Sequence, residues 1–107
     1  MTFNPSELNT YFIFNQRVVI LAILEVAKSR KKKTISVSEV YYQYIEICEK
    51  YQIEPVFKNN ILQPLKVVEV AGIIKIKDGE RITKLNLNPY TIDDWIKAIL
   101  EDPEIKS

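Results

Sequence analysis

The chain has 107 residues, of which 47% are hydrophobic and 27% charged, and this length predicts one domain, residues 1–107, with one hydrophobic core. It contains no histidine and one cysteine, Cys48, which excludes histidine-based zinc sites, histidine triads and internal disulfides and favours an intracellular setting. Its two glycines cannot form a phosphate-binding loop, and its longest apolar run, seven residues at 18–24, is too short to cross a membrane. We therefore expect no enzymatic activity, no cofactor and no membrane partner.

Charge is unevenly distributed along the chain, although the net charge is only +1. Residues 28–84 carry twelve basic and seven acidic side chains, whereas residues 85–107 carry two basic and five acidic ones. A basic middle segment suits a nucleic-acid footprint on one side of a domain, but the total is less basic than is typical of such domains. Charge alone therefore does not decide the partner.

The first predicted element is a helix over residues 16–28, with Asn15 as its N-cap. Because it is apolar on all sides, we expect the core to surround it. The apolar side chains before it are expected to pack onto that core; they are Leu8, Tyr11, Phe12, Ile13 and Phe14. The basic run after it is a loop and a candidate for phosphate contact, with a solvated loop or a localisation signal as alternatives; it consists of Arg30, Lys31, Lys32 and Lys33.

A second helix is predicted to begin at Ser36, after a short strand at residues 34–35. Ser36 and Glu39 match the capping box, in which each side chain accepts a hydrogen bond from the other residue's backbone amide. Apolar residues then recur every three or four positions and predict the buried face. They are Val37, Val40, Tyr41, Tyr44, Ile47, Cys48 and Tyr51, with Tyr42 on the outside. We read Cys48 as an inert buried thiol.

A third helical segment is predicted over residues 57–71, with Ile61, Leu65 and Val68 buried and Gly72 as its stop. Pro64 cannot donate a helical hydrogen bond, so we expect a kink or a fresh first turn there. Residues 73–77 and 80–87 predict a β-hairpin around a tight Asp78–Gly79 turn.

A short C-terminal helix is predicted after Thr91, with Asp93 and Asp94 at its positive end and Trp95, Ile96 and Ile99 docked on the core. The acidic residues near this end of the chain do not have the spacing of a calcium loop, so we expect no metal site. They are Asp93, Asp94, Glu101, Asp102 and Glu104.

This order of elements is typical of an α+β winged helix, a helix-turn-helix variant with a β-hairpin wing and a short terminal helix. In such a domain the third helix faces the DNA major groove and the wing reaches the backbone or minor groove. Cations neutralise phosphates and carboxamides address base edges, so the candidate DNA-binding residues are those of both types on these two elements. They are Lys58, Asn59, Asn60, Gln63 and Lys66 on the helix, and Lys75, Lys77, Arg81 and Lys84 on the hairpin. The alternatives are that the helix residues form an ordinary solvent-exposed face and that the hairpin lysines protect a sheet edge from aggregation. Glu54 and Glu69 would repel phosphate if they faced it.

Over residues 15–103 the sequence resembles the C-terminal winged-helix domain of archaeal and eukaryotic replication initiators, which are related to the largest origin-recognition-complex subunit and its cell-division-control partner. The resemblance rests on residues 21–24 and 40–48, where tyrosines precede Cys48, on residues 65–74, and on an archaeal-like ending at residues 98–103. Pro64 departs from the pattern, and the 107 residues hold no counterpart of the ATPase domain that normally precedes this module.

The resemblance implies binding of double-stranded origin DNA during replication and association with the chromosome, in the cytoplasm of an archaeon or the nucleus of a eukaryote. ATP binding does not carry over. The alternative is a protein-interaction winged helix that forms a homodimer or binds other replication or chromatin proteins, as in silencing relatives of the initiators. The near-neutral charge and the apolar residues Phe3, Tyr42 and Phe57 favour this alternative.

Overall fold

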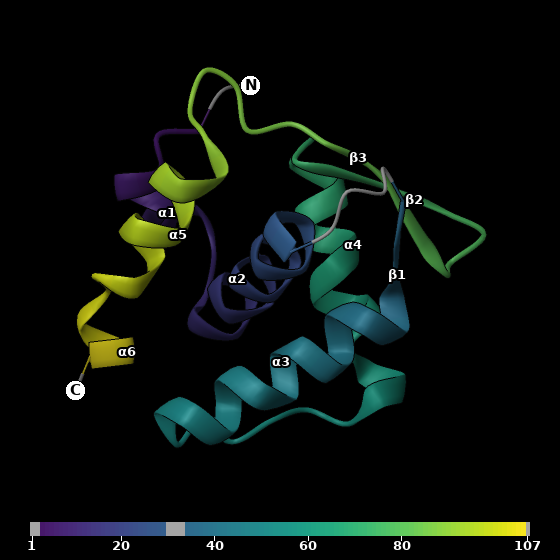
Figure 1. The fold of residues 1–107 in the computed structure, drawn as a ribbon, viewed down its shortest axis with the longest axis horizontal. Helices are drawn as coiled ribbons and strands as arrows, with labels where there is room; N and C mark the ends of the chain where they lie inside the picture. Colours follow the sequence, from purple (N-terminus) through teal and green to yellow (C-terminus); the bar gives the residue numbers. More distant parts are fainter. Residues whose placement is uncertain (1–2, 30–33, 107) are drawn as a thin grey trace.

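A helical body carries a small antiparallel sheet at one end of the molecule (Figure 1). The structure, a computed structural model, describes residues 3–29 and 34–106. The elements in chain order are the 3-10 turn η1 (Pro5–Glu7), α1 (Leu8–Tyr11), α2 (Phe14–Ser29), β1 (Ile35–Ser36), α3 (Val37–Tyr51), the 3-10 turn η2 (Lys58–Asn60), α4 (Leu62–Val70), β2 (Ile74–Lys77), β3 (Arg81–Leu85), α5 (Ile92–Leu100) and α6 (Pro103–Lys106). This is the order of a winged helix, as the sequence predicts.

Helix α2 forms the centre of the core, because every residue from Val18 to Leu24 is buried. It lies between α5 on one side and α3 and α4 on the other (Figure 1). The prediction that Asn15 caps this helix is wrong. Helix α2 begins at Phe14, so Asn15 lies inside the helix. The Asn15 side chain instead accepts a hydrogen bond of 2.7 Å from the Tyr44 hydroxyl of α3.

The capping box of α3 is confirmed, and it sets the start of the helix. The Glu39 amide donates to the Ser36 hydroxyl at 3.1 Å, and the Ser36 amide donates to the Glu39 carboxylate at 3.4 Å. Val40, Tyr44, Ile47 and Cys48 are buried as predicted, while Tyr41 and Tyr51 are half-buried.

The third helical segment is not one helix over residues 57–71, because it divides into η2 and α4. Pro64 occupies the third position of α4, inside the first turn, where its missing N–H requires no helical partner. The expected fresh first turn is therefore what the structure has, and Ile61, Leu65 and Val68 are buried as predicted. Gly72 has φ +86°, and its amide and that of Ile73 satisfy carbonyls of the last turn.

The sheet has the strand order β1-β3-β2, and both pairings are antiparallel. Asp78 and Gly79 form the tight turn with φ of 58° and 66°, a left-handed conformation that glycine adopts at little cost. The hairpin is confirmed with slightly shorter strands, and we refer to β2, the turn and β3 (residues 74–85) as the wing. It projects from the body (Figure 1).

The N-terminal elements η1 and α1 lie beside α5 on the far side of α2 from the wing (Figure 1). Trp95 and Ile99 of α5 are buried against the core as predicted. Among the N-terminal apolar residues the prediction holds for Leu8 and Phe12 but is wrong for Tyr11 and Ile13, which are exposed. Among residues 3–29 and 34–106, no helix is long and apolar enough to span a bilayer.

Candidate nucleic-acid interface

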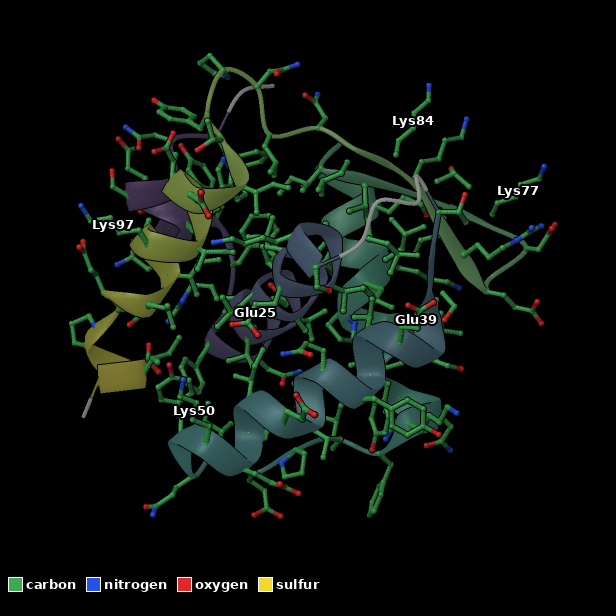
Figure 2. All side chains as sticks on the ribbon, in the orientation of Figure 1. Glu25, Glu39, Lys50, Lys77, Lys84 and Lys97 are labelled. Carbon is green, nitrogen blue, oxygen red and sulfur yellow. The ribbon has the colours of Figure 1, made fainter. Side chains whose placement is uncertain are left out.

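Nine candidate residues of the third helix and the hairpin lie within the described parts of the chain, and all nine side chains are exposed. They occupy two neighbouring elements, the η2–α4 segment and the wing, at the end of the molecule opposite α5 and α6 (Figure 1). The wing lysines Lys77 and Lys84 point away from the body (Figure 2). The four candidates Arg30, Lys31, Lys32 and Lys33 lie outside the described residues.

The η2 turn carries three of the candidates, Lys58, Asn59 and Asn60, in front of α4 rather than on it. The Lys58 ammonium lies over the Tyr42 ring of α3, 5.3 Å from its centroid, so a cation–π contact orients this side chain. The helix proper then contributes Gln63 and Lys66. Carboxamides and cations are therefore grouped around the N-terminal end of α4, where the positive end of the helix dipole also favours an anion.

Asn60 and Gln63 share an open groove of about 480 Å³. The groove runs between the start of α4 and the start of α2, and its walls combine carboxamides with apolar side chains. The other lining residues are Ile13, Asn15, Gln16, Val56, Pro64 and Val67. Asn60 and Gln63 are three residues apart in the sequence, and in the structure they line the same groove.

The wing presents its four cations on one face. In the hairpin register Lys75 lies directly opposite Lys84, and Lys77 lies directly opposite Arg81. Directly paired side chains of an antiparallel hairpin point to the same face. Arg81 makes a 3.3 Å ion pair with Asp78 that is exposed on both sides and so contributes little to stability. The three lysines form no salt bridge with any carboxylate of the described residues.

A β-bulge makes this arrangement possible. Arg81 and Lys84 are three residues apart, and a regular strand would direct them to opposite faces. The register changes between Lys75 and Ile76, so Thr83 is an extra residue in β3 and Lys84 returns to the face of Arg81. The hairpin pattern in the sequence contains no signal for this bulge.

Glu69 fixes the wing against α4. Its carboxylate accepts a hydrogen bond of 2.6 Å from the Ile76 amide of β2. The carboxylate is half-buried and engaged with the wing, so it does not project freely from the exposed face of α4, and it keeps its negative charge. This contact consequently fixes the position of the candidates on the wing relative to those on η2 and α4.

Two further residues that carry chemistry, Cys48 and Arg17, are buried in the core. Cys48 is buried, and burial raises the pKa of its thiol, which fits the prediction of an inert cysteine. Asp102 and Glu104 hold the buried guanidinium of Arg17 at 2.7 and 2.6 Å. Sequence reasoning missed the role of Arg17, and its position directly before the apolar run at residues 18–24 was the only available signal.

Comparison with known proteins agrees with the fold and the order of elements. Residues 10–97 match the family described as "CDC6, C terminal winged helix domain". The chain belongs to this family. Compared with individual curated proteins, the sequence of this CDC6-type domain matches none of them.

A solved structure, "Crystal structure of Cdc6p from Pyrobaculum aerophilum", is similar to this CDC6-type domain with a TM-score of 0.80 at 18% sequence identity. The likeness covers 99% of the chain and 27% of the archaeal protein, so the chain corresponds to about a quarter of that protein's length. At this identity the likeness shows the fold alone, which is the winged helix predicted from the sequence.

Proposed function

We propose that this chain is the DNA-binding winged-helix module of a replication initiator, that it binds duplex origin DNA on the chromosome, and that it is not catalytic. In this arrangement the exposed side of η2 and α4 faces the major groove, and the wing contacts the phosphate backbone. Membership of the CDC6 family supports the assignment to a replication initiator, since the sequence resembles proteins of that kind.

The observation that carries the proposal is the pairing of like charges on the wing. Lys75 opposes Lys84 and Lys77 opposes Arg81, and directly opposed like charges destabilise a hairpin. A polyanion such as the DNA backbone neutralises such pairs and releases condensed counterions when it does so. The pairing therefore costs stability in the free protein and becomes favourable in a complex with DNA.

Salt-dependent fluorescence anisotropy on a labelled duplex tests the proposal. We expect the logarithm of the binding constant to fall linearly with the logarithm of salt concentration, by about 0.9 for each phosphate contact. Lys75→Ala and Lys84→Ala should each reduce this slope. The matched controls are Lys50→Ala and Lys97→Ala, because both lysines are exposed and lie on the side of the molecule away from the wing (Figure 2).

Two results would overturn the proposal. One is the absence of duplex binding at low salt. The other is an equal loss of affinity in the Lys84 and Lys97 variants, because binding would then follow net charge rather than the wing.

A second candidate function is dimerisation or binding of another protein. Phe57 and Tyr42 favour it, since 78% and 65% of these residues are exposed, whereas Phe3 is buried and no longer supports it. Sedimentation velocity separates the two functions. A tight dimer that is indifferent to DNA and is lost in Phe57→Ala favours this second candidate, and a monomer that binds duplex favours the first.

A further inference from the structure

Two valines stand exposed on the outer side of α4. Val70 is 88% exposed and Val67 is 38% exposed. Gln63, Val67 and Val70 follow one another at spacings of four and three residues, so they form one stripe along the helix. We call these three residues the outer stripe of α4. It begins in the groove that Asn60, Gln63 and Val67 line together.

The surroundings of the outer stripe favour an anionic partner. Lys66 lies next to it in the same helix turn, and the wing with its cations is attached to the same helix through Glu69. Glu69 is the only acidic residue of α4, and its carboxylate is occupied by the Ile76 amide. An acidic macromolecule that approaches the stripe therefore meets one carboxylate of this helix, and that carboxylate is directed toward the wing.

The chemistry of the stripe matches one kind of base pair. In the major groove adenine presents an acceptor and a donor that a carboxamide can bind together, and thymine presents a methyl group that an apolar side chain can contact. Asn60 and Gln63 supply carboxamides, and Val67 and Val70 supply branched apolar surface. Guanine is most often read by arginine or lysine. Neither η2 nor α4 contains an arginine, and of their two lysines Lys58 is held over the Tyr42 ring, which leaves Lys66 as the one lysine of this segment without that contact.

A protein partner fits this surface less well. The apolar part consists of two valine side chains, one of them mostly covered, with carboxamides and a lysine around them. The buried centre of a protein interface is depleted of charged residues and is usually built on large aromatic anchors. The charge and the amide content of this surface both favour DNA.

We propose that Val67 and Val70 contact thymine methyl groups in the major groove while Asn60 and Gln63 bind adenine, so that η2 and α4 together select A·T base pairs. This inference rests on the proposed DNA-binding function and adds the class of sequence that is bound. It assigns the selectivity to η2 and α4 and leaves the wing to hold phosphates of any sequence.

Replacing thymine by uracil tests the inference, because uracil forms the same base pair without the methyl group. Binding is measured by anisotropy on an alternating d(A-T) duplex and on the corresponding d(A-U) duplex. The full chain should bind the d(A-T) duplex more tightly, by about fourfold for each methyl–valine contact, if each buried methyl contributes as a buried CH₂ group does.

The double variant Val67→Ala, Val70→Ala should reduce this difference, because the smaller side chains cover less of each methyl group, while still binding the d(A-U) duplex. Lys66→Ala is the matched control on the same helix, because it should weaken both duplexes and preserve their ratio. A wild-type chain that binds the two duplexes equally would overturn the inference and leave the proposed function intact. If neither duplex is bound, the proposed function itself fails. If the double variant instead dissolves a dimer, the stripe is a protein interface and the inference is wrong.

Discussion

The Glu69 carboxylate accepts a hydrogen bond of 2.6 Å from the Ile76 amide, and this contact attaches the last turn of α4 to the first strand of the wing. Ile76 lies at the register change of the hairpin, where the ladder is locally irregular. A charged acceptor for this amide therefore stabilises the wing where the regular strand pairing is interrupted.

Glu69→Ala should lower the free energy of unfolding by about 1.5 to 3 kcal/mol, the usual contribution of a hydrogen bond to a charged group. Urea titration measures this loss, and hydrogen exchange should show faster exchange of the Ile76 amide. Glu49→Ala is the control, because Glu49 is exposed on α3 and the variant changes the net charge equally. Equal stability of the two variants would contradict the role of Glu69.

Arg17 connects the start of α2 to the C-terminal segment of the chain. Its guanidinium is buried and binds the Phe12 carbonyl, Asp102 and Glu104. The Asp102 side chain is mostly buried, whereas that of Glu104 is 59% exposed. Asp102→Asn should therefore cost about 3 kcal/mol by leaving a buried cation poorly compensated, and Glu104→Gln should cost less than about 1 kcal/mol. Thermal unfolding of both variants checks the order, and a larger loss for Glu104→Gln would refute it.

The Tyr44 hydroxyl links three segments, since it donates to the Asn15 side chain at 2.7 Å and accepts from the Val56 amide at 3.0 Å. Tyr44→Phe should lower the free energy of unfolding by about 1 kcal/mol. Tyr42→Phe is the control, because Tyr42 is exposed.

The Tyr44 contribution should also depend on pH. Burial raises the pKa of Tyr44 from 10.0 to about 12. Because the folded state holds the proton more tightly, this residue's contribution is complete below pH 10 and is lost as the pH rises toward 12. Urea titrations across this range should show the advantage of wild type over Tyr44→Phe shrinking. A constant advantage would contradict the assigned pKa.

The sequence predicts features that depend on neighbouring residues better than features that depend on distant ones. The capping box at Ser36, the helix start at Thr91 and the Asp78–Gly79 turn are local patterns, and the structure confirms all three. The Arg17 contacts with Asp102 and Glu104 span more than eighty residues, and no local pattern announces them.

The candidate interface shows the same division. The residue types and their exposure follow from amphipathic patterns, so all nine described candidates lie on the surface. The division of the third helix was predicted only as an option at Pro64, and the face shared by Arg81 and Lys84 depends on a bulge that the hairpin pattern does not contain. Register is a property of two strands together, which a pattern within one strand does not determine.

Lys84→Glu should change stability and DNA binding in opposite directions. Opposite charges at a directly opposed position stabilise a hairpin by about 0.2 to 1 kcal/mol, so pairing Lys75 with a glutamate should raise the free energy of unfolding. The same variant should weaken duplex binding and reduce the salt slope by about 0.9 or more, because a phosphate contact is lost. Lys50→Glu alters the net charge equally on the far side of the molecule and should leave the slope unchanged (Figure 2). If stability and binding both decreased, the variant would have damaged the wing. The prediction would then be contradicted, and the opposed pair Lys75 and Lys84 would not be a feature that DNA binding requires.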